Sequence, residues 1–465
     1  SNLLNPTDAY TAQGLGIAYV SKELGDLHLT VGHMYEQIGS GIIFKAYEER
    51  ALLLDNALLG LRARYSISPD WQVTAFGGKQ KNLFDLYDSF LAGGKLEGFI
   101  ILGDNGASVA PGIGLLTKTL ADSQMDDLAN VLSTYTPDDF IDEAPYHNLA
   151  LTLYNTLQIN ALTWYIEGAY KSRDVFIDLY APRSLWTGER TQGKYVLEPG
   201  YVLYNALSYV KGKVGITLEN KVTSNFNYRA DPFASLNRGM ISFLPPMVRF
   251  NTYRLTSRYT PATQDLGEIA GQLEVSYRPN TKQGFLINGS WINDLRGTHL
   301  YREVVTELTF RKPREYVFIG GLQFQWYNQE RYEGKTDVPI VRTLTPYIDY
   351  LYRFSRKASL RTELQYMHTD QDWGSWLFLL AEVGIAPHWV FELSDMWNVR
   401  PYVDASGVRK NDPLHFPAVG VTYTYEGHRI SVRYVKQVEG VVCSGGICRL
   451  EPAFSGLRIL LSSQF

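Results

Sequence analysis

The sequence predicts an all-β fold, a large antiparallel transmembrane β-barrel of about 20–24 strands. Three observations predict it: a composition rich in tyrosine (32) and glycine (40), many short segments that alternate apolar with polar residues, and connections that alternate between short and long. Aromatic residues favour strands, and lipid outside with water inside requires the alternation. We expect one domain over residues 1–465, with a lumenal insert or folded loop.

The last strand shows the alternation most clearly, because an arginine lies among aliphatic residues. A soluble sandwich with a half-buried strand is the alternative for this strand alone. An apolar face that ends on phenylalanine is, however, typical of the terminal strand of an outer-membrane barrel. The expected outward face comprises Leu457, Ile459, Leu461 and Phe465, and Arg458, Ser462 and Gln464 lie on the other face.

The same pattern recurs in earlier segments of the chain, which favours a barrel over a sandwich. Charged residues keep falling on the face that a sandwich would bury, whereas a barrel with a polar interior accommodates them. The segments are RISVRYVK, SLRTELQY, REVVTELTFR, QLEVSYR and VGITLENK.

The connections between these segments are alternately short and long, as in outer-membrane barrels with short periplasmic turns. The C-terminus is therefore expected on the periplasmic side and residues 439–452 outside. Aromatic girdles at the strand ends are expected to include four tryptophans. The short turns are 278–284, 311–315, 354–359, 386–388 and 425–428, the longer loops are 293–299, 329–338, 369–374, 395–413 and 439–452, and the tryptophans are Trp326, Trp373, Trp376 and Trp389.

Charge and hydropathy exclude other classes. The 44 basic and 48 acidic residues nearly cancel, so a nucleic-acid partner is not expected. No apolar stretch is long enough for a membrane-spanning helix. The chain begins SNLLNPTDAY, without Met or a leader, and is interpreted as a mature or trimmed form.

The only two cysteines, Cys443 and Cys448, lie in the loop predicted to be external. A disulfide is reasonable in that oxidising compartment, and the SGGI between them permits a tight reversal. It would stabilise the fold by about 2 kcal/mol. A redox-active or metal-binding dithiol is the alternative, although the spacing is not CxxC.

Residues 33–58 break the strand rhythm, and we expect this segment to fold into the lumen. Arg62 and Arg64 alternate with apolar residues and should point inward. Carboxylates of the segment could pair with them and narrow the pore; a charged external loop is the alternative. The predicted lumen network is Glu36, Lys45, Glu48, Glu49, Arg50, Asp55, Arg62 and Arg64.

Residues 119–145 combine a helical pattern with an acidic run, which indicates a folded loop or insert. A calcium site is conceivable there, but a solvated acidic loop is favoured because the EF-hand spacing is absent. An enzyme is not expected: His33 with Ser40 is the nearest approach to a hydrolase. No cofactor or metal site is predicted. The candidate calcium ligands are Asp138, Asp139, Asp142 and Glu143.

Four motifs carry a resemblance: YEQIGSGIIFKAYEERALLLDNALLG, ISFLPPMVRFNTYRL, LRTELQY with APHW, and CSGGICRLEPAFSGLRILLSSQF. With them the sequence resembles an uncharacterised family of outer-membrane barrel proteins from Bacteroidota, a domain of unknown function. The resemblance implies a barrel in the outer membrane of a Gram-negative bacterium, and additional strands before the first motif. It implies no activity.

Three functions remain open. The first is a structural or scaffolding component of an outer-membrane assembly with a narrow or plugged lumen, in contact with outer-membrane lipid and with other outer-membrane or surface proteins through its external loops. The second is a porin or channel for small solutes, and the third, weakly supported, is an outer-membrane hydrolase. Mixed charges favour the first, since a charge-selective pore lines its lumen with one sign. The predicted inward charges include Glu167, Glu219, Glu274, Glu303, Glu307, Glu363, Lys221, Arg278, Arg311, Arg353, Arg361, Arg429, Arg433 and Arg458.

Overall fold

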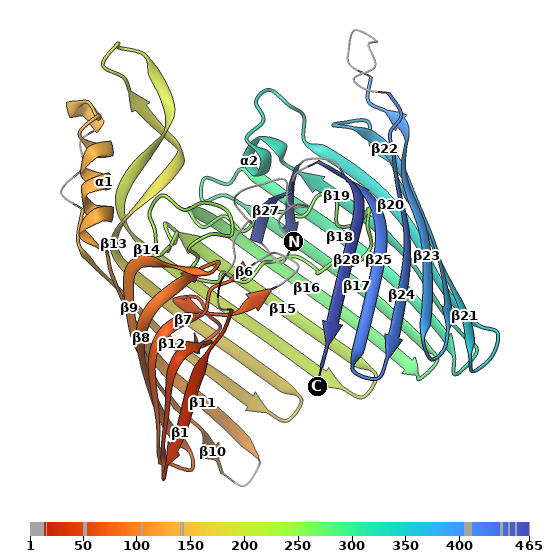
Figure 1. Cartoon of the computed structure of the whole chain (residues 1–465), viewed down its shortest axis with the longest axis horizontal. Coiled ribbons are helices and arrows are strands. Elements are labelled where there is room, and N and C mark those ends of the chain that lie inside the picture. Colours follow the sequence, from red (N-terminus) through yellow and green to blue (C-terminus); the bar gives the residue numbers. More distant parts are fainter. Residues whose placement is uncertain are drawn as a thin grey trace.

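The computed structural model shows a curved antiparallel sheet that wraps around an interior occupied by coil (Figure 1). It describes residues 14, 16–49, 54–103, 106–139, 141, 144–403, 412–437, 440–444, 447–451 and 453–464; for 440–451 only the backbone is described. Among these residues, no helix is both long and apolar enough to cross a lipid bilayer.

The wall is one sheet of 22 strands, each paired antiparallel with its neighbours. The predicted fold class is therefore confirmed. The wall strands are β1 (Tyr19–Leu24), β2 (Leu27–Met34), β7 (Leu58–Ser68), β8 (Trp71–Asn82), β9 (Asp85–Gly98), β10 (Ile100–Leu102), β11 (Ala107–Thr119), β12 (His147–Ile159), β13 (Leu162–Ser184), β14 (Arg190–Lys211), β15 (Val214–Ser224), β16 (Gly267–Asn280), β17 (Gln283–Asn293), β18 (His299–Lys312), β19 (Tyr316–Tyr327), β20 (Val341–Arg353), β21 (Ala358–Met367), β22 (Gly374–Ile385), β23 (Trp389–Pro401), β24 (His415–Tyr425), β25 (His428–Gln437) and β28 (Phe454–Ser463).

Within the described residues no pairing joins the first wall strand, β1, to the last, β28. β9 and β10 both pair with β11 and form one interrupted strand. Smaller hairpins leave the wall at β3 (Gln37–Ile38) with β4 (Phe44–Lys45), β5 (Glu48–Glu49) with β6 (Leu54–Asp55), and β26 (Gly440–Ser444) with β27 (Ile447–Glu451).

The two faces of the wall are inverted relative to a soluble sheet. Large apolar side chains point outward, as the alternation predicted for β21: Leu364 is 43% exposed, whereas Glu363 beside it is 7% exposed. Polar residues are buried on the inner face, where Gln323 and Gln365 are fully covered. An apolar exterior with a polar interior suits a wall that stands in lipid.

Aromatic residues gather near the short turns, where neighbouring rings contact each other. Examples are Tyr277 with Phe285 and Trp389 with Tyr423. Trp326 and Trp389 are exposed, as girdle residues should be. The girdle prediction was wrong for Trp376, which is 1% exposed because it packs inward against Phe416 and under Arg258.

Most long connections lie at one end of the sheet and the short turns at the other. The β13–β14 hairpin rises beyond its neighbours at the long-loop end (Figure 1), since β12 pairs with β13 only up to Lys171. Helix α1 (Asp122–Leu132) lies within the predicted 119–145 stretch. It packs Leu128 against Val175 and Leu197 of this hairpin. Helix α1 therefore supports the part of the β13–β14 hairpin that extends beyond the neighbouring strands.

Candidate functional site: the segments inside the lumen and the pocket above them

Residues 225–266, the connection between β15 and β16, form the principal content of the interior and are here called the lumen segment. In Figure 1 this yellow-green coil runs across the inside of the wall. Gln80 of β8 donates to the Met240 carbonyl oxygen at 2.6 Å, while Gln365 of β21 accepts from the Leu255 amide at 2.7 Å. The lumen segment therefore contacts wall strands that lie far apart around the sheet.

Wall lysines hold the first half of the lumen segment through its backbone. Lys118 and Lys171 share the carboxylate of Asp174, at 2.8 and 3.3 Å. Lys171 also donates to the Asn227 carbonyl at 2.7 Å, and Lys118 to the Arg229 carbonyl at 3.2 Å. All three charged side chains are buried, so each cation needs both its carboxylate and its carbonyl partner.

A third buried lysine, on β15, makes the same two kinds of contact: one with a carboxylate and one with a backbone carbonyl of the lumen segment. Lys221 of β15 is bound to Glu268 of β16 at 2.7 Å and donates to the Pro245 carbonyl at 2.6 Å. Because backbone carbonyls are the acceptors, these contacts depend on the path of the lumen segment rather than on its side chains.

Side chains of the lumen segment bind its second half to the wall. Arg249 pairs with Glu307 at 3.0 Å, and Asn251 donates to Glu303 at 2.8 Å. Tyr259 donates to Asp372 at 2.9 Å. Apolar side chains of the lumen segment pack on the wall between these bonds and are nearly fully buried: Phe226, Tyr228, Ile241, Met247, Leu255 and Tyr259.

The predicted 33–58 segment also lies against the inner face of the wall. The Ser40 amide donates to Glu167 of β13 at 2.8 Å, and Phe243 of the lumen segment donates its amide to the Gly41 carbonyl. Gly39 has φ +57°, and a Cβ there would lie 2.6 Å from a Glu167 oxygen. Close approach at this turn therefore requires glycine.

Of the predicted lumen network, the structure brings Glu36 together with both arginines. Its carboxylate lies 3.3 Å from Arg62, 3.3 Å from Arg64 and 3.3 Å from Lys95. Lys95 was missed because it lies on β9, three wall strands from β2.

The other predicted network residues have different surroundings. Asp55 pairs with Lys81 and accepts from the Tyr35 hydroxyl, rather than meeting an arginine. Lys45 lies over the Phe243 ring at 3.7 Å. Glu48 and Glu49 are exposed, and Arg50 lies outside the described residues. Narrowing of the pore by this segment stays a prediction.

Glu36 gives a pH-dependent contribution to stability. Burial alone would raise the pKa of Glu36, but Lys95, Arg64 and the Gln37 amide lower it overall. A lowered carboxyl pKa contributes stability above the unfolded value, and the contribution is lost as the pH falls through the folded value. We therefore expect the unfolding temperature to fall with acidification below pH 4.5, the ordinary pKa of this carboxyl.

The matched variant is Glu36→Gln, which leaves three cations with a neutral amide. We expect it to lower the free energy of unfolding by about 3 kcal/mol near neutral pH and to flatten the acid dependence. Thermal unfolding of both proteins between pH 3 and pH 7 measures this. An equally steep acid dependence in the variant would assign the effect to other carboxylates.

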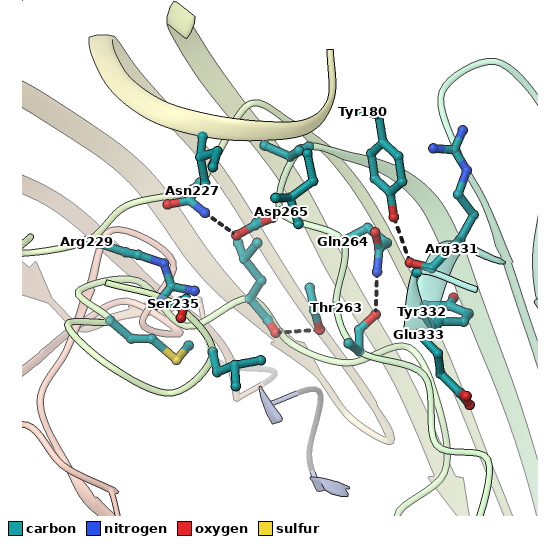
Figure 2. A pocket seen from close by; sticks show the side chains of 18 of the residues that line it. Tyr180, Asn227, Arg229, Ser235, Thr263, Gln264, Asp265, Arg331, Tyr332 and Glu333 are labelled. Atoms are coloured by element: carbon teal, nitrogen blue, oxygen red, sulfur yellow. Dashed lines mark hydrogen bonds between the residues drawn. The ribbon is translucent and has the colours of Figure 1, made fainter. Parts of the chain in front are cut away.

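A pocket of about 760 Å³ lies at the long-loop end. Its floor is the lumen segment, one side is the β13–β14 hairpin, and another is α2 (Gln329–Glu333) with the turn after it. Figure 2 shows Asn227, Asp265, Gln264 and Tyr332 around it. This volume is in the usual range for ligand sites, about 300–1,000 Å³.

Contacts across this pocket hold its sides together. The Tyr180 hydroxyl donates to the Arg331 carbonyl at 2.7 Å (Figure 2), and the Arg331 guanidinium lies 4.3 Å from the Tyr180 ring centre. Asn227 donates to Asp265 at 2.8 Å, and burial raises the pKa of Asp265. Acidic and basic side chains are balanced here, so the pocket does not favour a strongly charged ligand.

The predicted disulfide lies where only the backbone is described. Cys443 and Cys448 are directly opposed in the β26–β27 register, a spacing within the reach of a disulfide. Their side chains lie outside the described part, and the bond stays a prediction. Thiol titration of the unfolded protein with and without reductant tests it, and we expect reactive thiols only after reduction.

The structure describes only part of the two alternative sites, the acidic calcium site and the His33–Ser40 pair. Asp139 binds Lys194 at 2.7 Å, whereas Asp142 and Glu143 lie outside the described residues. Among described residues, no group of three or more His, Cys, Asp or Glu side chains is arranged to hold a metal. His33 contacts the Ala18 backbone at 3.1 Å, and no hydrogen bond joins it to Ser40. Phe465 of the predicted terminal signal also lies outside the described residues.

Sequence reasoning missed the lumen segment. Its signal is a stretch of 42 residues without strand alternation, interrupted by Pro232, Pro245, Pro246 and Pro261. A connection this long inside a compact fold is usually functional.

The sequence matches the Family of unknown function (DUF6029) over residues 1–465. The chain belongs to this family. No curated protein matches it.

Several solved structures are similar to this chain. The ferric-catecholate import receptor Fiu from E. coli K12 has 9% identity over 96% of this chain and 78% of its own, with a TM-score of 0.40. The ferric enterobactin receptor PfeA from Pseudomonas aeruginosa has 9% identity over 96% and 77%, with a TM-score of 0.43. OpdK from Pseudomonas aeruginosa, solved with vanillate, has 9% identity over 86% and 96%, with a TM-score of 0.38.

Proposed function

We propose that this DUF6029 protein is an integral outer-membrane β-barrel that acts as a structural or scaffolding component, with a lumen closed by its own lumen segment. The observation that carries the proposal is the span of that segment, which is bonded to wall strands from β8 to β21. Buried ion pairs and backbone bonds hold it in a single path. A fixed obstruction suits a structural barrel better than a pore.

The location rests on the wall. The outward apolar face requires lipid, and the division into short turns and long loops suits a barrel whose short side is periplasmic. The C-terminal strand then ends in the periplasm, and the β26–β27 hairpin, the β13–β14 hairpin and α2 lie outside as contact surfaces. Trp186, at the tip of the β13–β14 hairpin, is 72% exposed, and exposed tryptophans are frequent anchors of protein interfaces.

Extraction of the native membrane in mild detergent, followed by native electrophoresis, tests the scaffolding role. We expect the protein to migrate as part of an assembly larger than its own 52.7 kDa chain in a micelle. We expect Trp186→Ser to release it, and Trp164→Ser, a change on the lipid-facing wall, to serve as the control. Migration of the unmodified protein as a single chain would contradict the scaffolding role.

A porin or solute channel is the second candidate, favoured by the pocket of about 760 Å³ at the long-loop mouth. Such a pocket could collect a solute above a passage. Swelling of proteoliposomes in small sugars distinguishes the two: a closed barrel gives the rate of empty liposomes, and a channel gives faster swelling.

A further inference from the structure

A layer of buried polar side chains lines the inner face of β18, β19 and β20 beneath the lumen segment. Glu303, Gln323 and Thr345 are 1%, 0% and 0% exposed. Asn251 of the lumen segment covers Glu303, and the Thr256 carbonyl accepts from Gln323 at 3.0 Å. The layer is therefore sealed between wall and lumen segment.

Glu303, like Glu167, is a buried carboxylate with which no cationic side chain among the described residues pairs. Both Glu167 oxygens have other donors, namely the Thr152 hydroxyl on one and the Ser40 amide and Tyr165 hydroxyl on the other. Asp174 has Lys118 and Lys171, and Glu268 has Lys221. Glu363, three strands away on β21, has Arg361 at 2.9 Å. A buried carboxylate without a counter-charge is costly.

The hydrogen bonds at Glu303 involve only one of its two carboxylate oxygens. Asn251, Gln323 and Gln325 all donate to its Oε1 atom, at 2.8, 2.6 and 3.4 Å. Its Oε2 atom, Gln323 Oε1 and Thr345 Oγ1 are buried and have no hydrogen-bond partner among the described residues.

These three oxygens belong to neighbouring positions. Gln323 lies directly opposite Thr345 in the β19–β20 register, and its amide nitrogen contacts Glu303. The Tyr301 hydroxyl lies beside Glu303 and accepts from Gln325 at 2.9 Å. Its single proton can serve only one of the three oxygens.

We propose that Glu303 Oε2, Gln323 Oε1 and Thr345 Oγ1 bind a monovalent metal cation of the sodium class. Hard cations take carboxylate, amide and hydroxyl oxygens as ligands. One carboxylate balances one positive charge, whereas a divalent ion would leave an uncompensated charge in the same buried layer. A proton on Glu303 could form a hydrogen bond to only one of the other two oxygens, whereas a metal cation could be a partner for all three.

The cation would fasten the second half of the lumen segment to the wall through Glu303 and Asn251. Lys118, Lys171 and Lys221 fasten the first half by donating to its carbonyls. The proposal does not depend on whether the barrel is a scaffold or a channel, because it concerns only this layer.

Thermal unfolding of the purified protein in detergent tests the site, with NaCl replacing choline chloride at constant ionic strength. We expect the unfolding temperature of the unmodified protein to rise with the logarithm of the sodium concentration, as for any ligand of the folded state. Glu303→Gln removes the charge while keeping the shape, and we expect it to fold and to show no sodium dependence. Equilibrium dialysis against radioactive sodium should retain one ion per unmodified chain and none per variant chain.

Glu363→Gln is the matched control, because it changes a buried carboxylate on the inner face of β21 that is paired with Arg361. It should lower the unfolding temperature and keep the sodium slope. A flat sodium response in the unmodified protein, or an equal slope in Glu303→Gln, overturns the proposal. A flat response together with Glu303-dependent stabilisation on acidification would identify a bound proton instead and would equally overturn it.

Discussion

Replacing residues 227–262 with a short glycine–serine linker is expected to convert a silent barrel into a conducting one in planar bilayers. On the proposed function the lumen segment is the main obstruction. Its ends are already adjacent, because Ser224 and Gly267 are paired in the β15–β16 register. A short hairpin can therefore close the gap without disturbing the wall.

The control for this variant is to show that the wall and the 33–58 segment still fold. Gly39, Ser40 and Glu167 are retained, so the 33–58 segment keeps its contact with β13. Heat-dependent gel mobility should show that the shortened protein still folds. A folded but silent variant would mean that another part of the chain closes the lumen.

Asp174→Asn is expected to lower the free energy of unfolding by about 3–5 kcal/mol, because it leaves Lys118 and Lys171 buried without a counter-charge. Both cations would repel each other beside the lumen segment, and conductance should become unstable as its first half loosens. Thermal unfolding in detergent and bilayer recordings measure the two effects.

Two variants make this result specific. Asp178→Asn, in the outer part of the same strand, removes a carboxylate whose contact is the Tyr180 amide at 2.8 Å, and it should change stability by less than about 1 kcal/mol. The triple change Lys118→Met, Asp174→Leu and Lys171→Met removes the whole buried charge cluster and should restore most of the loss. A loss as large in the triple variant as in Asp174→Asn would mean that the charges are not the cause.

The wall could be predicted from sequence because its signal is local. Alternation over about ten residues assigns a face to each side chain, and on β21 the exposed Leu364 and the buried Glu363 and Gln365 lie on the predicted faces. The same reasoning placed a helical pattern at 119–145, where α1 is found. Trp376 shows where this reasoning fails. Its position near a strand end suggested a place in the aromatic girdle, but it lies on the inward face of its strand.

The interior could not be predicted to the same depth because its contacts join residues distant in sequence. Gln80 and Met240 are separated by 160 positions, and Leu255 and Gln365 by 110. Nothing local to Lys118 or Lys171 indicates that their partners include carbonyls of residues 227 and 229. Glu36 was predicted to meet Arg62 and Arg64 because all three lie in one short stretch, whereas Lys95 and Lys81 were not considered.

Single-channel recording of the unmodified protein in planar bilayers tests the central claim most directly. The lumen segment is bonded to strands around the wall by buried contacts, so a silent baseline is expected at every holding potential that the bilayer tolerates. Arg62→Ala and Arg64→Ala, which leave Glu36 with Lys95 alone, should raise leakage only if the 33–58 segment contributes to the seal. Steady conductance steps from the unmodified protein would contradict a closed lumen and would make the protein a channel.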